Sequence, residues 1–355
     1  MRTLRAVHIE GFKSIASADI TLGDLNVVIG ANGSGKSNLI GVFRLLERVL
    51  SHNLQLYVAG DPDRLLHHGR KATPRITLKL AFEGHSYDFK LLEQQDRLVF
   101  GSETIREIGP GHVVRTQALG RLESHFDEPG FNRVELPEDA LSLLRHLVVH
   151  HFQDVSDTAP AKQSADLDDN RYLRADAANL APYLYWLQER HPVEFRHIEE
   201  HVRLVAPFFD RFVLLPSRLN EKKIKLEWRQ KGSDAYFDGY SLSDGTLRFI
   251  CLATLLLQPT PPALILLDEP ELGLHPYAIR ILAELLDAAS QGAQVLLATQ
   301  SVTLMNQFAP ADVLVAENLG GQTSFRRLDE AALARWLAEF SLGELWEKNV
   351  LGGRP

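Results

Sequence analysis

A glycine-rich stretch at residues 30–37 carries residue types that bind a phosphate chain. Its glycines let the backbone turn so that successive N–H groups face an anion, and the helix expected after it adds a positive dipole end. Lys36 would reach the β- and γ-phosphates of a nucleotide, and the Ser37 hydroxyl would bind Mg²⁺. The apolar run before the stretch and the helical leucine pattern after it disfavour the alternative, a hairpin followed by a chance Lys-Ser pair. The candidate nucleotide-binding residues are Gly30, Ala31, Asn32, Gly33, Ser34, Gly35, Lys36, Ser37 and Asn38.

Two adjacent carboxylates follow a second informative stretch, the apolar run at residues 264–267. Ligands of α/β folds lie at the carboxyl ends of parallel strands, which is where this run would place its acidic residues. Asp268 would hold the metal, directly or through water, and Glu269 would polarise an attacking water. The alternative is a strand followed by an acidic helix cap, which the phosphate loop in the same chain disfavours.

A third candidate site stands at the start of an apolar helix, where Ser243 and Gly245 lie about one helix before the carboxylate pair. Unpaired N–H groups and a hydroxyl at a helix start can bind an anion. The same residues are common as a helix N-cap, and on their own they would indicate no more than that. Their position between the phosphate loop and the Asp-Glu pair favours a nucleotide contact.

Apolar periodicity predicts the elements that must position these groups. Strands are expected at residues 4–10, 15–22, 25–29, 147–149, 208–215, 224–228, 263–267, 294–299, 312–317 and 323–328, with an antiparallel meander between 76 and 100. Helices are expected at residues 36–50, 140–147, 178–189, 192–206, 243–258, 275–290 and 330–340. Residues 101–136, rich in glycine, proline and charge, are expected to form a long loop, and residues 341–355 a tail.

Composition excludes several classes of protein. The formal net charge of -8 excludes a surface that is basic all over, so nucleic acid would need a local patch or an assembled partner. No apolar run is long enough to span a bilayer, so no membrane association is expected. Cys251 is the single cysteine, which excludes an internal disulfide and makes a cytoplasmic location the expectation.

Over essentially its whole length the chain resembles the ABC-class ATPases of the SMC, RecF and OLD type, and among them the small stand-alone AAA-type ATPases. The resemblance rests on residues 11–14 (Gly-Phe-Lys-Ser), 30–37, 243–246, 267–270, 271–276, 298–301 and 343–349. It implies an α/β fold: an ABC-type ATPase head with a P-loop parallel sheet core, an N-terminal antiparallel β subdomain and a helical lobe. The expected parts are an N-terminal lobe at 1–153, a helical lobe at 154–216, and the rest of the ATPase core at 217–355.

The resemblance also implies how the residues work together. Two subunits would sandwich two ATP molecules with Mg²⁺, each held by one subunit's phosphate loop and by Ser243 and Gly245 of the other. Glu269 would be the general base, Ser37 and Asp268 metal ligands, and Gln153 a sensor of both the metal and the water. Gln300 stands where most relatives have histidine; an amide can contact a γ-phosphate but carries no charge, so slow hydrolysis is expected.

The function implied is an ATP-hydrolysing homodimer in DNA repair, chromosome maintenance or anti-phage defence, acting with DNA or with a partner such as a nuclease. A basic run at residues 218–231 is either a solvated strand face or a DNA-facing patch. Arg70 is either an arginine finger or a surface loop residue. The alternatives are a non-hydrolysing or slow regulatory switch, which Gln300 mildly favours and Glu269 disfavours, and a transporter subunit, which residues 11–14 and 271–276 disfavour.

Overall fold

The computed structural model describes residues 4–107, 114–117, 120–126, 128 and 136–353. The chain forms two compact units. Unit 1 comprises Met1–Val149, Pro262–Leu266 and Ala293–Pro355, and unit 2 comprises His150–Pro261 and Leu267–Gly292. Within the described ranges, none of the helices combines the length and the apolar character needed to cross a bilayer.

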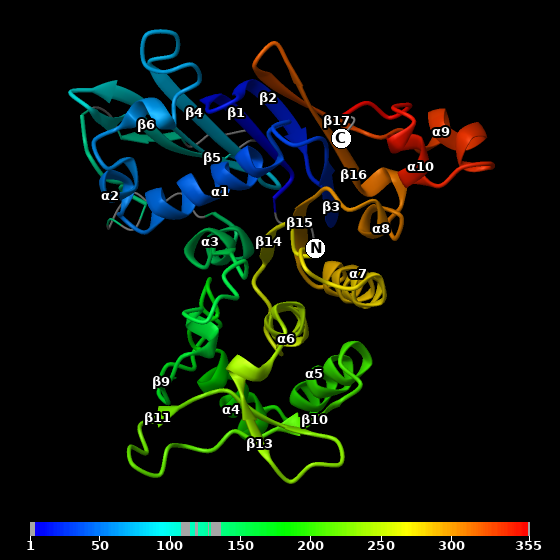
Figure 1. The fold of residues 1–355 in the computed structure, drawn as a ribbon. Helices are drawn as coiled ribbons and strands as arrows, with labels where there is room; N and C mark the ends of the chain where they lie inside the picture. The colour runs from blue at the N-terminus through cyan, green and yellow to red at the C-terminus, as the bar shows by residue number, and fades with distance from the viewer. Residues whose placement is uncertain (1–3, 108–113, 118–119, 127, 129–135, 354–355) are drawn as a thin grey trace. The chain divides into compact units, whose positions relative to one another are not determined.

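Unit 1 contains an antiparallel sheet with the strand order β2-β1-β4-β5-β6-β7 (Figure 1). The strands are β1 (Ala6–Phe12), β2 (Ile15–Thr21), β4 (Arg75–Ala81), β5 (His85–Gln94), β6 (Arg97–Glu107) and β7 (Val114–Gln117). Alternate residues of β4, such as Ile76, Leu78 and Leu80, are buried because successive side chains of a strand point to opposite faces. One face of this sheet therefore contributes to the core of unit 1.

A second sheet has the order β17-β16-β3-β15-β14-β8, and it carries the phosphate loop at the end of β3. Its strands are β3 (Leu25–Ile29), β8 (Val149–His150), β14 (Leu264–Asp268), β15 (Gln294–Thr299), β16 (Val313–Leu319) and β17 (Gln322–Arg327). β3 is parallel to both β15 and β16, whereas β17 returns antiparallel to β16. Every residue of β3 and β15 is buried, as expected of central parallel strands covered on both faces.

Helix α1 (Lys36–Leu50) connects the two sheets of unit 1, because its apolar face packs in the same core as strands of both. The other helices of this unit are α2 (Leu54–Val58), α3 (Glu138–Arg145), α8 (Val302–Met305), α9 (Glu330–Leu337) and α10 (Leu342–Glu347), with short 3₁₀ turns at Pro62–Arg64 and Pro310–Asp312. No residue of α9 is buried, whereas Leu345 and Trp346 of α10 are fully buried.

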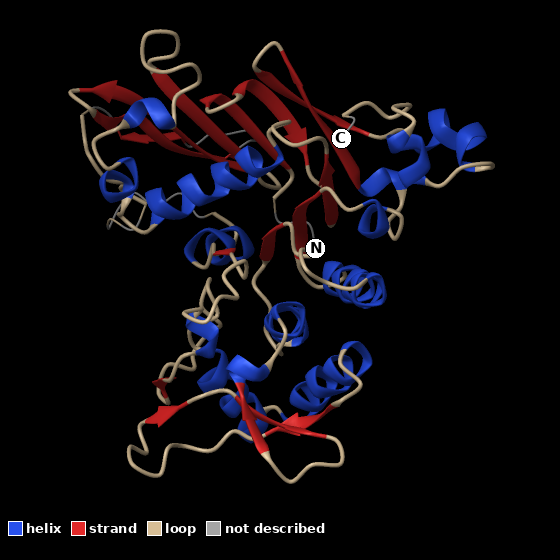
Figure 2. Cartoon of the chain, viewed as in Figure 1, coloured by secondary structure: helices blue, strands red, loops and turns tan. Residues whose placement is uncertain are grey.

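Unit 2 combines four helices with two small sheets (Figure 2). The helices are α4 (Leu180–Arg190), α5 (Pro192–Val205), α6 (Asp244–Leu257) and α7 (Pro276–Ser290), with 3₁₀ turns at Pro160–Lys162 and Gly239–Ser241. One sheet has the order β10-β12-β13, formed by β10 (Phe209–Phe212), β12 (Glu227–Gln230) and β13 (Tyr236–Asp238). The other pairs β9 (Ala165–Asp166) with β11 (Lys223–Ile224). Trp228 stacks between Phe209 and Phe237, which gives the three-stranded sheet an aromatic centre.

Two expectations from the sequence were wrong. The long loop expected at 101–136 contains the end of β6 and all of β7, because β5 continues far enough to pair with ten residues of β6. Residues 108–113, 118–119, 127 and 129–135 of that stretch lie outside the described residues. The tail expected after residue 340 contains α10, which begins with a capping box in which Ser341 and Glu344 satisfy each other's backbone N–H groups.

Candidate functional site

The phosphate loop of unit 1 has the backbone shape of an anion cradle. Gly33 and Gly35 have φ values of +77° and +101°, a region that glycine enters without the cost that a Cβ brings. A Cβ on Gly33 would meet no atom within 4 Å, so the loop is open above this residue. Lys36 is buried, and its Nζ donates to the carbonyl oxygens of Gly30 and Ala31 at 2.7 and 2.8 Å. The open backbone turn, the lysine and the exposed Ser37 hydroxyl fit a triphosphate with Mg²⁺.

Residues of the Gly-Phe-Lys-Ser turn brace this loop from the first sheet. The Ser14 hydroxyl lies 2.7 Å from Thr323 Oγ1 of β17 and accepts a hydrogen bond from Asn38 Nδ2 at 2.6 Å. Thr323 Oγ1 in turn donates to the Ser34 carbonyl at 2.9 Å. A Cβ at Gly35 would overlap Thr323, so the loop and β17 approach each other as closely as glycine allows. The resemblance named residues 11–14, but their partner Thr323 carries no sequence signal of its own.

Gln300 lies in unit 1 beside the phosphate loop. β15 pairs with β3 in a register that matches Thr299 with Ile29, so the residues after the two strands, Gln300 and Gly30, are neighbours. Ser301 then caps α8 through a hydrogen bond from Leu304 N–H at 3.2 Å. The parallel pairing thus places Gln300 next to the first residue of the phosphate loop, and its contact with a γ-phosphate stays a prediction.

The other predicted groups belong to unit 2, where Gln153 and the carboxylate pair meet. Gln153 Nε2 donates to the main-chain oxygen of Asp268 at 3.2 Å. Asp268 and Glu269 are both half-buried, and Glu269 has a φ of +48°, which is uncommon for a residue with a side chain. Such backbone strain persists where surrounding structure holds it, often at functional sites. The Leu272 N–H donates a hydrogen bond to the main-chain oxygen of Glu269 at 3.2 Å, which closes the turn after Glu269.

Ser243 and Gly245 begin α6, and the residues after Glu269 pack directly against them. The Ser243 side chain is exposed and accepts from Thr246 N–H at 3.2 Å, which makes it the N-cap. Gly245 lies against the carbonyl of Gly273, so close that a Cβ on Gly245 would overlap that oxygen. Two motifs separated by 27 residues therefore form one surface within unit 2.

Arg248 is a residue that the sequence reasoning missed. It is buried on α6, and its guanidinium donates to the Phe152 oxygen at 2.9 Å through Nε and to the Gln153 oxygen at 3.1 Å through Nη2. Burial lowers the pKa of Arg248, while the carboxylates of Asp244 and Glu271 oppose that shift. One arginine thus joins the Ser243 helix to the Gln153 loop. The only sequence signal was a lone charge in an otherwise apolar helix segment.

Arg70 is held by carboxylates of its own unit. Its guanidinium contacts Asp63, Glu93 and Asp96 at 3.0, 2.9 and 2.7 Å. These contacts favour the structural interpretation of Arg70 as a loop residue over an arginine finger.

Two further observations concern Cys251 and metal ligands. Burial raises the pKa of Cys251 to about 12, which fits core packing. Within the described part of the chain, no group of three or more potential metal-ligating side chains was found.

Comparison with known proteins identifies the family. Residues 25–306 match the family described as "AAA domain, putative AbiEii toxin, Type IV TA system", which is well over half of the chain. The chain belongs to this AAA-domain family. No curated protein matches the chain.

Solved structures similar to this AAA-domain protein are heads of SMC proteins. One is an SMC head bound to the C-terminal winged-helix domain of ScpA, with a TM-score of 0.61, 16% identity, and coverage of 94% of this chain and 99% of that one. Another, from Pyrococcus furiosus, is an Smc head with an extended coiled coil bound to the C-terminal domain of ScpA, with a TM-score of 0.60, 15% identity, and coverage of 96% and 99%. The Smc head of Pyrococcus yayanosii has a TM-score of 0.54 at 14% identity and coverage of 96% and 99%.

These likenesses establish the fold of the AAA-domain protein as that of an ABC-class ATPase head of SMC type. The fold class expected from the sequence is confirmed. At identities of 14–16% the likeness shows the fold alone.

Proposed function

We propose that this protein hydrolyses ATP and that ATP closes two copies of the chain into a dimer, which hydrolysis reopens. The observation that supports this most directly is the phosphate loop, whose open glycine turn and buried Lys36 form an anion cradle at the start of α1. Bound Mg²⁺ would neutralise charge on the phosphates. Lys36 and Ser37 would bind the triphosphate and its metal, with Asp268 as a further metal ligand.

Glu269 would accept a proton from the attacking water, and Gln153 and Gln300 would orient that water and a γ-phosphate oxygen. Ser243 and Gly245 would cover the γ-phosphate bound by the other subunit. Support for a contact between subunits comes from the exposed position of Ser243 at the start of α6. The client process, in this proposal, is DNA repair, chromosome maintenance or anti-phage defence, with DNA or a partner protein as the target of the motion.

The test is Glu269→Gln, which keeps the size and hydrogen-bonding capacity of the side chain but removes its ability to accept a proton. We expect ATP binding to be retained, turnover to fall by about two orders of magnitude or more, and an ATP-bound dimer to accumulate. Steady-state phosphate release and light scattering after size exclusion measure the two effects.

Lys36→Ala is the companion variant, for which we expect neither tight ATP binding nor a dimer. Unchanged turnover in Glu269→Gln would remove the base assignment. Nucleotide binding without turnover in the native protein would instead support the non-hydrolysing switch.

A further inference from the structure

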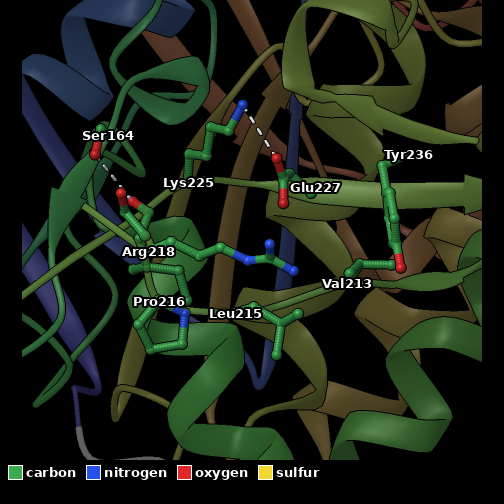
Figure 3. Close-up of a pocket in the computed structure, with 10 residues that line it drawn as sticks. Ser164, Val213, Leu215, Pro216, Arg218, Lys225, Glu227 and Tyr236 are labelled. Carbon is green, nitrogen blue, oxygen red and sulfur yellow. Dashed lines mark hydrogen bonds and ion pairs between the residues drawn. The ribbon is translucent and has the colours of Figure 1, made fainter. Parts of the chain in front are cut away.

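The lobe formed by unit 2 contains a cavity that the proposed ATPase chemistry does not use. Its volume is about 410 Å³, within the range of ligand pockets, and its lining comes from β11, β12, β13 and the segment 213–218 that follows β10 (Figure 3). The apolar residues that line it, here called the wall, are Val213, Leu215, Pro216 and Ile224. The polar residues of the lining include Arg218, Lys225, Glu227 and Tyr236.

The wall and the loop beside it expose large apolar side chains to solvent. Leu215 is 64% exposed and Leu219, four residues later, is fully exposed. Isolated exposed leucines are ordinary, whereas an exposed leucine that lines a formed cavity offers apolar surface to a ligand there.

Arg218 is the cation in this cavity that is available to a ligand. Figure 3 shows its guanidinium extending between the Glu227 side and the Leu215 side of the cavity. Lys225 is paired with Glu227 at 3.0 Å, and Lys223, next to the cavity, is paired with Asp166 at 3.0 Å. Among the described residues, the Arg218 guanidinium has no ion pair or hydrogen bond to another side chain.

The charge around the cavity is opposite to that of the whole chain. Residues 217–231 contain six Lys or Arg residues against two Glu, in a chain whose net charge is -8. A partner with negative charge is therefore attracted to this part of the lobe.

The arrangement suits a peptide better than a nucleic acid strand. Base recognition on single strands uses aromatic rings with an available face. Among the lining residues that the structure describes, Tyr236 is the one aromatic residue, so the cavity has no row of rings for successive bases. The Arg229 guanidinium lies 4.6 Å from the centre of that ring and covers one of its two faces. An apolar wall next to one unpaired guanidinium complements an apolar side chain next to a carboxylate.

We propose that this cavity is the docking site for an acidic segment of a partner protein, in which an apolar side chain fills the wall and a neighbouring carboxylate pairs with Arg218. The inference deepens the proposed function, on which it rests for the existence of a protein partner. The cavity itself involves only residues of unit 2 outside the predicted nucleotide contacts.

The experiment presents the purified full-length chain with two bead-bound libraries of ten-residue peptides. Both libraries contain Leu, Ile and Phe; one adds Asp and Glu, and the other adds Lys and Arg. We expect the native chain to be captured by the acidic library at least about tenfold more than by the basic one, at about 0.15 M salt. Arg218→Glu should reverse this preference. Leu215→Asp should lower capture by both libraries, because it removes apolar surface from the wall.

Lys231→Glu is the matched control, because it makes the same change of charge on the same lobe but does not line the cavity. It should keep the acidic preference, and circular dichroism should show that every variant is folded. Equal capture of both libraries, persistence of the preference in Arg218→Glu, or its loss in Lys231→Glu would overturn the proposal. So would a thirty-nucleotide single strand of DNA that displaces the peptides and binds through Arg218 more tightly than they do.

ATP binding measured on the same preparations separates the two proposals. Loss of peptide capture with normal ATP-dependent dimerisation would reject the docking site alone. Normal capture without ATP binding would reject the proposed function and leave the cavity assignment standing.

Discussion

Gly245 occupies a position at which a side chain has no room. A Cβ at this position would overlap the carbonyl oxygen of Gly273. Because that oxygen belongs to the backbone, it cannot rotate away as the end of a side chain would. The glycine of the serine-led motif is therefore required by packing within unit 2, in addition to any contact with a nucleotide. The sequence pattern alone could not separate these two reasons.

Gly245→Ala should consequently destabilise the lobe even without ATP. Forcing a methyl group against backbone costs about 1–3 kcal/mol, which would appear as a lower urea midpoint with an unchanged slope. Gly292→Ala is the control, since a Cβ there meets no atom within 4 Å and its backbone is not in the left-handed region. Equal midpoints for the native chain and Gly245→Ala would show that the segments can move apart.

His150 makes stability depend on pH. Burial lowers its pKa from 6.5 to about 4, and its Nδ1 has no hydrogen-bond partner among the described residues. The unfolded chain therefore binds a proton as the pH falls through 6.5, whereas the folded chain binds it only near pH 4. The folded state therefore loses stability as the pH falls from 6.5 to about 4.

His150→Phe should remove that loss. Over the interval from pH 7.5 to pH 5 the native chain should lose about 2 kcal/mol more than the variant, as calculated from the two pKa values. Urea unfolding at both pH values measures the difference, and carboxylates shared by the two proteins cancel in the comparison. Parallel pH profiles would mean that His150 is accessible to protons in the folded state.

At the scale of elements, the C-terminal tail is part of the phosphate-loop scaffold. Trp346 of α10 is fully buried, and its Nε1 donates to the Gly353 oxygen at 2.8 Å. Gly353 N–H donates to Glu317 Oε1 of β16 at 2.6 Å, and a Cβ on Gly353 would lie 3.5 Å from the Cα of Gly30. Gly343, at the other end of the tail, donates its N–H to Asn306 Oδ1, just after α8. The tail thus connects the segment after Gln300 to the first residue of the loop.

Trp346→Ala should therefore affect both stability and nucleotide binding. Removing a buried indole costs about 3–5 kcal/mol, and the freed Gly353 would no longer support Gly30. Thermal unfolding and fluorescent-nucleotide titration should both report a loss. Trp336→Ala is the control, because Trp336 on α9 is 47% exposed and should change neither quantity appreciably. A destabilised Trp346→Ala protein that binds nucleotide normally would confine the tail to a structural role.

At the scale of the whole molecule, the proposed dimer makes each nucleotide site composite. Lys36 and Ser243 would contact the same ATP from different subunits, so each variant alone would lose both sites. Lys36→Ala mixed with Ser243→Arg would restore one site, composed of the Lys36 of one subunit and the Ser243 of the other. The expected division of the chain into an N-terminal lobe at 1–153, a helical lobe at 154–216 and the rest of the ATPase core at 217–355 stays a prediction.

Mixing these two variants with ATP and Mg²⁺ should therefore produce dimers that neither variant forms by itself. The expected hydrolysis is at most about half that of the native protein, because one of two sites is intact. Light scattering and phosphate release on the mixture and on each variant alone check the prediction. If either variant dimerises alone, or the mixture stays monomeric while the native chain dimerises, the sites are not shared in this way.

The local features of the site could be predicted from the sequence: the glycine turn between β3 and α1, the carboxylates at the end of β14, the serine at the start of α6 and the order of these motifs. Each depends on residues within one turn or one strand, where spacing and residue type decide the conformation. Three sets of contacts could be identified only in the folded chain. Arg248 contacts the Gln153 loop, Thr323 contacts Ser14 and Ser34, and Gly353 contacts β16. Those partners lie tens to hundreds of residues apart, and packing alone brings them together.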